Sequence, residues 1–168
     1  MSEPRKLRCY QYVNRPYEAV RELFRQRPLQ VFQPATTSAA ERANVVETSL
    51  RAGVAGLEAG VDVCVHLHAI REEEGVAGLS PITRVTLAWE AKRAAGFFPV
   101  MRADLSFFPL TSTETQLELE GSYRPPLGVV GNVADAAVGH RVAEATVHRF
   151  LEDIVEQIRR ELPLRPEA

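Results

Sequence analysis

The sequence predicts an α+β protein in which an antiparallel sheet is covered on one face by a long C-terminal helix. Two observations lead to this prediction. Between residues 44 and 123, apolar and polar side chains alternate with a period of two, in segments joined by short turns. Residues 128–162 then change to a helical period. A sheet with one apolar face must cover that face with another element, and the last helix can provide the cover.

The N-terminal part predicts one strand and one or two short helices. Residues 7–14 alternate and are rich in Tyr, Val and Leu, which favours a strand. Asn14 and Pro16 suit a helix start, because Asn caps helices and Pro fits their first position. The helix should end before Pro28. Its apolar face consists of Tyr17, Val20, Leu23 and Phe24. Residues 33–43 fit either a second short helix with a capping box or a loop.

The middle of the chain predicts five further strands, about six in all. They are expected at residues 44–53, 61–70, 82–93, 97–108 and 114–123. Inward-facing positions of the last three are Val85, Leu87, Trp89, Met101, Ala103, Leu105, Phe107, Leu117 and Leu119. Short turns between consecutive strands favour an antiparallel meander. No repeat or low-complexity linker divides the sequence, so we expect residues 1–168 to form a single domain.

The C-terminal helical pattern has two unlike halves. In the back half, the apolar stripe consists of Val147, Leu151, Ile154 and Ile158, with Phe150 beside it. The side expected to face water consists of Glu152, Asp153, Arg159 and Arg160. In the front half, the same stripe consists of Val133, Ala137, His140 and Glu144. Two of these four are polar and none of the apolar ones is bulky, so the front half should leave space beneath it.

Two questions about this front half stay open. Gly131 and Gly139 each cost about 1 kcal/mol against Ala in a helix interior, so the helix is either continuous or broken before His140. Large side chains of the sheet can also occupy the space. Trp89, Phe107 and Tyr123 are either such fillers or the walls of a pocket.

Composition excludes several classes of function. The net charge of the 168 residues is −2 with acids and bases mixed, so no basic footprint for nucleic acid is present. No apolar run approaches the roughly 20 residues of a membrane-spanning helix, and the first residues do not form a signal peptide. We therefore expect a cytoplasmic protein without membrane insertion, in which Cys9 and Cys64 are free thiols.

The order of elements resembles the START/Bet v 1-like superfamily, whose bacterial members are often called SRPBCC or polyketide cyclase/dehydrase-like proteins. Residues 118–158 (ELEGSYRPPLGVVGNVADAAVGHRVAEATVHRFLEDIVEQI) look like its last strand and the glycine-punctuated start of its long helix. Residues 12–24 (YVNRPYEAVRELF) are similar to its first strand and helix. The resemblance implies a helix-grip fold: a curved antiparallel sheet of six or seven strands around the C-terminal helix, with an apolar cavity between them. It implies no particular reaction, because members bind lipids, sterols or polyketides and only some cyclise or dehydrate them.

Few residues suggest chemistry. His140 and Glu144 lie one helical turn apart, so a carboxylate could orient a histidine that acts as general acid or base. Otherwise His140 is a half-buried residue with its hydrogen bonds satisfied, and Glu144 is its solvated neighbour. His66 and His68 share a strand face, as in some metal sites, but that face should be the outer one. Arg102 and Asp104 are expected to form an outer-face pair, or to enter the pocket if the apolar side of their strand faces outward into a dimer. The orientation of Tyr10 and Tyr12 stays open, because Cys9, Gln11 and Val13 on the other face are no more apolar. We expect no metal and no cofactor.

These observations lead to three hypotheses about function. The first is a binding protein for a small apolar or amphipathic molecule, such as a lipid or polyketide. The second is a cyclase, dehydratase or hydrolase in the same cavity, with His140 as acid/base and Glu144 orienting it. The third is a homodimer formed through the edge or outer face of the sheet. For the first, the expected ligand-binding residues are Val85, Leu87, Trp89, Met101, Leu105, Phe107, Leu117, Leu119, Tyr123, Val133, Ala137, His140 and Glu144.

Overall fold

The computed structural model describes residues 5–50, 63–75, 80–91, 100–124 and 133–164. Side chains are described within these ranges except at 40–50, 63–64, 89–91, 100–101, 123–124, 133–140 and 142. The elements are β1 (Arg5–Val13), α1 (Tyr17–Gln26), α2 (Pro28–Leu50), β2 (Val63–Glu73), β3 (Ile82–Ala91), β4 (Val100–Pro109), β5 (Thr115–Arg124) and α3 (Val133–Glu161).

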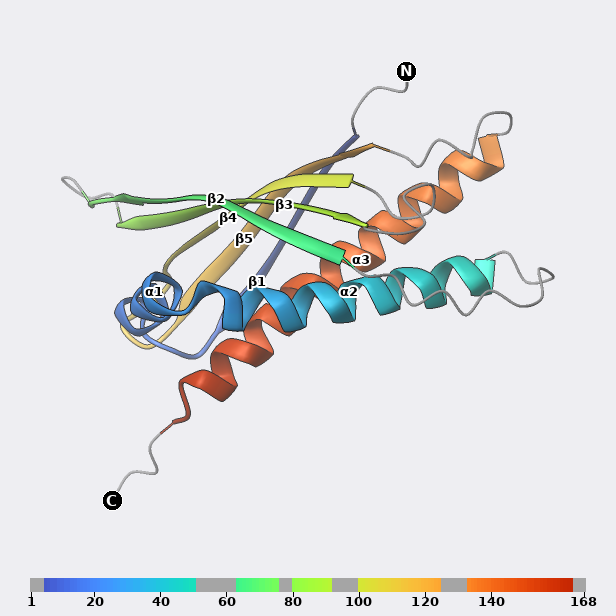
Figure 1. Cartoon of the computed structure of the whole chain (residues 1–168). Coiled ribbons are helices and arrows are strands. Elements are labelled where there is room, and N and C mark those ends of the chain that lie inside the picture. Colours follow the sequence, from blue (N-terminus) through green and yellow to red (C-terminus); the bar gives the residue numbers. More distant parts are fainter. Residues whose placement is uncertain (1–4, 51–62, 76–79, 92–99, 125–132, 165–168) are drawn as a thin grey trace.

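The strands form one antiparallel sheet in the order β1-β5-β4-β3-β2 (Figure 1). This architecture broadly fits the helix-grip arrangement expected from the resemblance. The described residues contain five strands, however, and the prediction of six or seven was wrong for this part of the chain. In the described side chains of β3, β4 and β5, apolar residues lie on the inner face and mostly polar residues on the outer face, as the sequence predicted. β1 differs because Tyr10 and Tyr12 lie outside, and a register shift between Leu67 and Ala69 interrupts the alternation of β2.

The missing strand is the one predicted at residues 44–53. Residues 44–50 are instead the last turns of α2, and 51–62 lie outside the described residues. Alternation over so few positions does not separate a strand from a helix. Once α2 has begun at Pro28, each added residue gains a helical hydrogen bond without a new nucleation step. The second helix is therefore long rather than short, and 33–43 lie inside it.

Pro34 is compatible with α2 because it lies on the solvent side. A proline has no N–H to donate, so the carbonyl of Gln30 loses its usual helical donor. Both residues are exposed, where water can serve that carbonyl. Two turns are reinforced by side chains, since Thr36 Oγ1 donates to the carbonyl of Phe32 at 2.8 Å and Thr37 Oγ1 to that of Gln33 at 3.1 Å.

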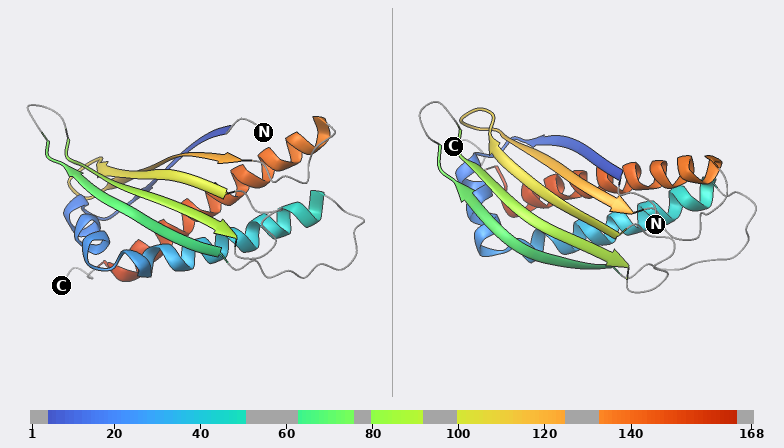
Figure 2. Two further views of the ribbon diagram at one scale, coloured as in Figure 1. Left: turned by 45° about the horizontal axis from the view of Figure 1, so that its top comes forward. Right: turned by 90° about the horizontal axis from the view of Figure 1, so that it is seen from above.

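The helices form a second layer beneath the inner face of the sheet. α2 and α3 pack along each other, with α3 under β1 and α2 under β2, and α1 closes one end (Figures 1 and 2). The helix α3 passes through Gly139 without a break, which answers that open question, while Gly131 lies outside the described residues. None of the helices in the described residues has the length and apolar character needed to span a bilayer.

A chain of four phenylalanine rings ties these layers together. Phe107 of β4 lies 4.8 Å from Phe24 of α1, ring centre to ring centre. Phe24 lies 5.4 Å from Phe32 of α2, and Phe32 lies 6.4 Å from Phe150 of α3. All four are fully buried, and pairs at such separations add to the stabilisation from burial. We call these four residues the aromatic chain.

The back half of α3 follows the predicted pattern except at one position. Its apolar stripe, including Phe150, is buried as expected. Asp153, expected in water, is only 8% exposed. Its carboxylate pairs with Arg149 Nε at 3.1 Å, and the same Nε donates to Ser38 Oγ of α2 at 2.9 Å. The prediction failed because α2 covers this side of α3, which the helical period alone does not reveal.

Arg15, in the turn between β1 and α1, holds the C-terminal end of α3. Its guanidinium donates to the backbone carbonyl of Leu162 and, at 3.5 Å, to that of Arg159. The last carbonyls of a helix have no helical donor and carry partial negative charge, so a buried cation suits them. The carbonyl of Arg15 itself accepts from Thr115 Oγ1 at 2.8 Å, which ties the same turn to β5.

Replacing Phe107 with Ala should lower the free energy of unfolding by about 3–5 kcal/mol, because a fully buried ring of the aromatic chain is lost. Phe108→Ala is the matched control: the neighbouring ring is only partly buried and belongs to the outer face. Urea denaturation followed by circular dichroism measures both. Equal losses in the two variants would contradict the role given to the aromatic chain.

Replacing Arg15 with Met should cost roughly 1.5–3 kcal/mol, because carbonyls at the end of α3 lose a charged donor while the apolar length is kept. Arg160→Met, at an exposed position of the same helix end, should change the stability by under about 0.5 kcal/mol. The same denaturation assay decides. A loss no larger than that of the Arg160 variant would show that Arg15 does not stabilise the end of α3.

Candidate functional site

One end of the interior is filled with large side chains. Among the residues predicted to bind a ligand, those fully buried in the core are Val85, Leu87, Leu105, Phe107, Leu117 and Leu119. Register places Phe107 opposite Leu117, and Leu105 opposite both Leu119 and Val85, so these five residues form two adjacent rows on the inner face, with Leu87 in the next row. Helix residues of the aromatic chain cover this end, next to α1. The back of the interior is therefore packed, as the sequence led us to expect.

Farther from α1 the inward-facing residues become small on β4, β5, α2 and α3, whereas Leu87 of β3, opposite Ala103, stays large and fully buried. Ala103 follows Leu105 on the inner face of β4, and Gly121 follows Leu119 on β5. Ala143 and Ala39 are buried on α3 and α2. We call these four residues, Ala39, Ala103, Gly121 and Ala143, the small-residue belt.

The small-residue belt lies at a similar depth on all four elements. Each helix residue is seven positions from its ring in the aromatic chain, about 10 Å at 1.5 Å per residue. On the strands the belt begins four positions from Phe107 and Leu117, about 13 Å at 3.3 Å per residue. Side-chain volume thus falls with distance from α1 on β4 and β5 of the sheet and on both long helices, while β3 keeps Leu87 in that row.

Beyond the small-residue belt, the backbone register aligns three further predicted residues. Trp89 pairs with Met101, and Met101 pairs with Tyr123, so β3, β4 and β5 contribute one continuous row. The structure thus brings together at backbone level residues that are 34 positions apart in the sequence. Their side chains lie outside the described ones.

The front half of α3 brings the predicted polar pair onto one helix. His140 and Glu144 lie four residues apart in a continuous helix, as do Val133 and Ala137. Glu144 is exposed, so its side chain is not buried in the interior as the predicted stripe had it, while the side chains of the other three lie outside the described ones. Of the described histidines elsewhere, those at positions 66, 68 and 148 all reach solvent.

The described interior holds few polar groups. Tyr17 Oη and Thr83 Oγ1 share a hydrogen bond of 2.8 Å, which joins α1 to β3 beneath the sheet. Cys9 lies on the inner face of β1 with a free thiol, as expected, whereas the side chain of Cys64 is outside the described ones. Burial raises the pKa of the Cys9 thiol to about 12, because an apolar environment disfavours the thiolate. The interior beside Cys9 therefore disfavours charge.

The other predicted pairs lie on the outer face. His66 and His68 reach solvent on β2, and in the described part of the chain no group of three or more His, Cys, Asp or Glu could hold a metal ion. Arg102 and Asp104 are exposed on β4, where Asp104 accepts a 2.6 Å hydrogen bond from Thr86. Tyr10 and Tyr12 are also exposed, which resolves their ambiguous orientation.

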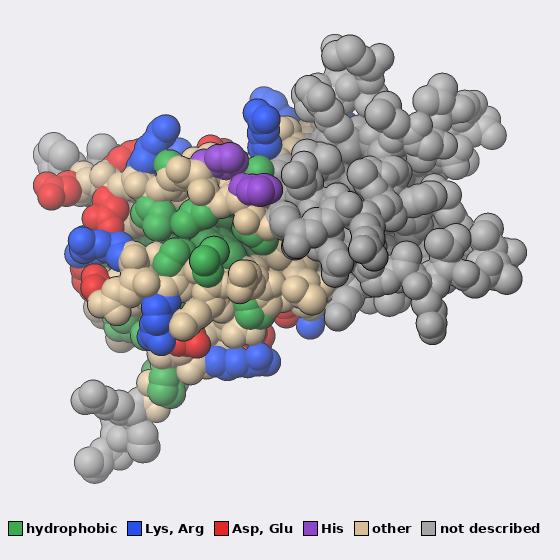
Figure 3. Space-filling view, in the orientation of Figure 1, with side chains coloured by type: hydrophobic (Ala, Val, Ile, Leu, Met, Phe, Trp, Pro, Cys, Tyr) green, Lys and Arg blue, Asp and Glu red, His purple; other side chains and the backbone are tan. Residues whose placement is uncertain are grey.

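The interior is not fully closed along β2. Hydrophobic side chains reach the surface between β2 and the start of α2 (Figure 3). Val65, Leu67 and Ile70, on the inner side of β2, pack against the core but are only partly buried. This edge therefore presents apolar surface next to the interior.

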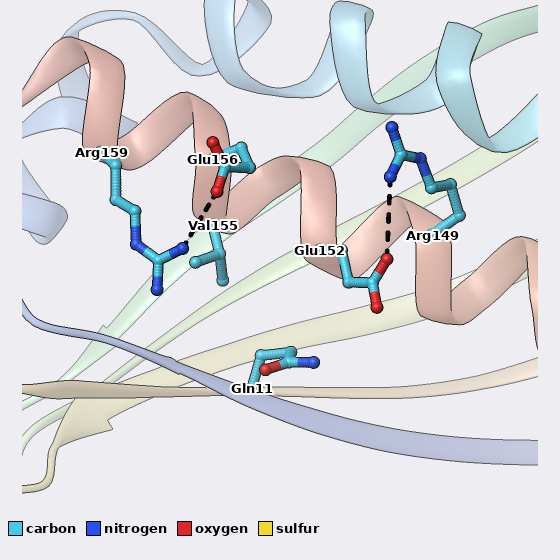
Figure 4. A pocket seen from close by; sticks show the side chains of 6 residues that line it. All are labelled: Gln11, Arg149, Glu152, Val155, Glu156 and Arg159. Carbon is cyan, nitrogen blue, oxygen red and sulfur yellow. Dashed lines mark hydrogen bonds and ion pairs between the residues drawn. The ribbon is translucent and has the colours of Figure 1, made fainter.

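A polar groove between β1 and α3 was not predicted from the sequence. It has a volume of about 340 Å³ and is lined by Gln11, Arg149, Glu152, Val155, Glu156 and Arg159 (Figure 4). Its charges pair with one another, Arg159 Nη1 with Glu156 at 3.0 Å and Arg149 Nη1 with Glu152 at 3.8 Å. The spacing of these charges on α3 was visible in the sequence, but only the fold reveals that β1 lies opposite them.

Among known proteins, similarity was found to solved structures. No protein-family model and no curated protein matches the sequence. TTHA0849 from Thermus thermophilus is 13% identical, with a TM-score of 0.46 over 94% of this chain and 99% of that one. The ZhuI aromatase/cyclase from a Streptomyces species is 16% identical, with a TM-score of 0.45 over 96% and 98%. Ara h 8.0201 is 9% identical, with a TM-score of 0.27 over 93% and 98%. These names agree with the resemblance predicted from the sequence, and likeness at this level carries no argument about the site.

The buried thiol of Cys9 makes stability depend on pH in the alkaline range. The unfolded thiol ionises near pH 8.5, whereas the folded one resists ionisation up to about pH 12. Its contribution to stability is therefore complete below about pH 8.5 and is lost as the pH rises towards 12. Over this range, the free energy of unfolding should fall more steeply for the native chain than for Cys9→Ala. Parallel curves for the two proteins in urea denaturation would disprove burial of this thiol.

Proposed function

We propose that the protein binds a small apolar or amphipathic molecule, such as a lipid or polyketide, between the sheet and the front half of α3. The observation that supports this proposal is the small-residue belt. Tightly packed interiors leave few voids, so a simultaneous loss of side-chain volume in both layers needs a compensating occupant. Because large side chains fill the interior next to α1, we assign the ligand to the opposite end.

The proposed site uses the predicted residues in two roles. Buried residues from Val85 to Leu119 form its closed inner end, and Leu87 borders the small-residue belt. The backbone row of Trp89, Met101 and Tyr123 is assigned to its sheet side, and the predicted residues Val133, Ala137, His140 and Glu144 are assigned to its helix side. An apolar pocket selects its ligand by shape and by a few polar groups, for which His140 and Glu144 are the candidates. The whole site belongs to one domain, residues 1–168, which we propose acts in the cytoplasm without a cofactor.

The first test of this function looks for the ligand directly. Protein freshly purified under native conditions should release an apolar molecule on denaturation and extraction, detected by mass spectrometry at close to one per chain. The neutral probe N-phenylnaphthylamine should also bind to the stripped protein with enhanced fluorescence. Absence of both an extracted molecule and probe binding would rule out the proposed function.

A variant that fills the small-residue belt provides the structural test. Ala143→Leu should weaken binding of N-phenylnaphthylamine at least about tenfold, equivalent to about 1.4 kcal/mol, because leucine occupies the volume left for the ligand. Ala145→Leu, two residues along α3 on a less buried face, is the control and should leave the affinity unchanged. If the interior is already filled, Ala143→Leu will instead cost about 1–3 kcal/mol of stability through overpacking. That destabilisation, measured in urea, would contradict the proposal.

A second function rests on His140 and Glu144. A histidine one turn from a carboxylate, at the side of an apolar pocket, could act as acid or base in a cyclase, dehydratase or hydrolase. Incubation of the recovered molecule with the protein would show turnover, and His140→Ala should abolish it while the affinity for N-phenylnaphthylamine remains. His148→Ala, at an exposed position of the same helix, is the control. Binding without turnover would leave the first function alone.

A further inference from the structure

β1 is a regular edge strand without a bulge. It runs over nine residues and pairs with β5 without any shift of register. In the described part of the chain, that is its only partner strand. The opposite edge, β2, differs, because a register shift between Leu67 and Ala69 distorts it and Arg71, Glu72 and Glu73 follow. Bulges and charges protect an edge from pairing, whereas a regular edge is a template for another strand.

Charge and aromatic side chains are divided between the two halves of β1. The first half carries Arg5, Lys6 and Arg8, all exposed. The second half carries Tyr10 and Tyr12, whose exposed fractions are 73% and 57%. Two copies aligned antiparallel would therefore place the basic half of each strand beside the aromatic half of the other. A parallel arrangement would place like charges together, which is unfavourable.

We propose that β1 pairs antiparallel with β1 of a second copy of this chain about a two-fold axis, so that one sheet continues through both copies. With the axis at Cys9, Arg8 lies opposite Tyr10 of the second copy and Lys6 lies opposite Tyr12. These four positions share the outer face, since they alternate with the buried Cys9. A cation beside an aromatic ring is attractive, and directly opposed side chains are the pairs that stabilise a sheet.

The surroundings of β1 suit this arrangement. On the outer face, Arg8 pairs with Glu118 and, at 3.1 Å, with Glu120 of β5, so its guanidinium lies towards β5 and has to turn across β1 to reach Tyr10 of the second copy. On the inner side, the polar groove separates Gln11 of β1 from α3 (Figure 4). That space means that α3 does not fill the region next to the edge. An extended peptide of another protein could use the same backbone groups, but the observed division of charge is complementary to β1 itself.

The test compares association of the native chain with that of two double variants. Sedimentation equilibrium from about 1 μM to about 1 mM covers the range in which weak dimers dissociate. Tyr10→Lys with Tyr12→Lys places a lysine opposite Arg8 and Lys6, so the dimer fraction should fall at least about tenfold. His148→Lys with Gln33→Lys adds the same two charges at exposed positions away from β1 and should associate like the native chain. Circular dichroism checks that both variants are folded.

Amide hydrogen exchange locates the interface. Amides within residues 5–13 should exchange more slowly as the native protein is concentrated, and those of β2 should not change. A chain that stays monomeric at about 1 mM, where even weak interfaces associate, would overturn the proposal. It would also be overturned by a dimer that survives the two lysines, or by concentration-dependent protection confined to other elements. Monomers that acquire β1 protection only on addition of an extended peptide would assign the edge to a foreign strand instead. None of these outcomes affects the proposed ligand site, which lies on the other side of the sheet.

Discussion

The contact between four phenylalanine rings decides how the layers of this protein are spaced. Phe107, Phe24, Phe32 and Phe150 come from a strand and from each of the three helices, and each ring touches the next. Fully buried aromatic side chains make the largest individual contributions to a core. Because the rings are linked in series, they join β4 to α1, α1 to α2 and α2 to α3 at the end of the interior next to α1. The distance between the helices and the sheet in the rest of the interior starts from this packed end.

The packed end of the interior next to α1 affects how the helices lie against the sheet at the small-residue belt. The helices continue beyond the aromatic chain as rigid rods, so they cannot simply collapse onto the sheet where Ala39, Ala103, Gly121 and Ala143 replace larger residues. Shortening a side chain without moving the backbone leaves volume. The ligand-binding proposal depends on this relation between a tight end and a less filled end. It does not depend on the identity of any single polar residue.

Polar interactions connect the elements at the end of α3 and between α2 and α3. Arg15 supplies donors to carbonyls at the end of α3, and Arg149 links Asp153 of α3 to Ser38 of α2. Both groups lie at seams between elements, where Arg15 gives carbonyls a donor and Arg149 gives the carboxylate of Asp153 an ion-pair partner. The outer face is different, because its charges pair across the strands in water and contribute little to stability. This leaves the outer face and the β1 edge available for association.

The sequence by itself determined the local features whose causes are local. Strand faces follow from alternation: Val85, Leu105 and Leu119 were correctly placed inside, and Arg102 and Asp104 outside. The back stripe of α3 follows from its helical period in the same way. These patterns reflect the geometry of one element, which its own residues specify.

The tertiary structure determined those features of one element that depend on contact with another element, such as the length of α2 and the burial of Asp153. Residues 44–50 joined α2 because a helix already running beside α3 could extend, and Asp153 became buried because α2 covers it. The small-residue belt and the row from Trp89 to Tyr123 exist only through strand register and helix direction. Single small residues in a sequence carry no such information. Their meaning arises from long-range packing, which brings residues that are distant in the chain to one depth in the fold.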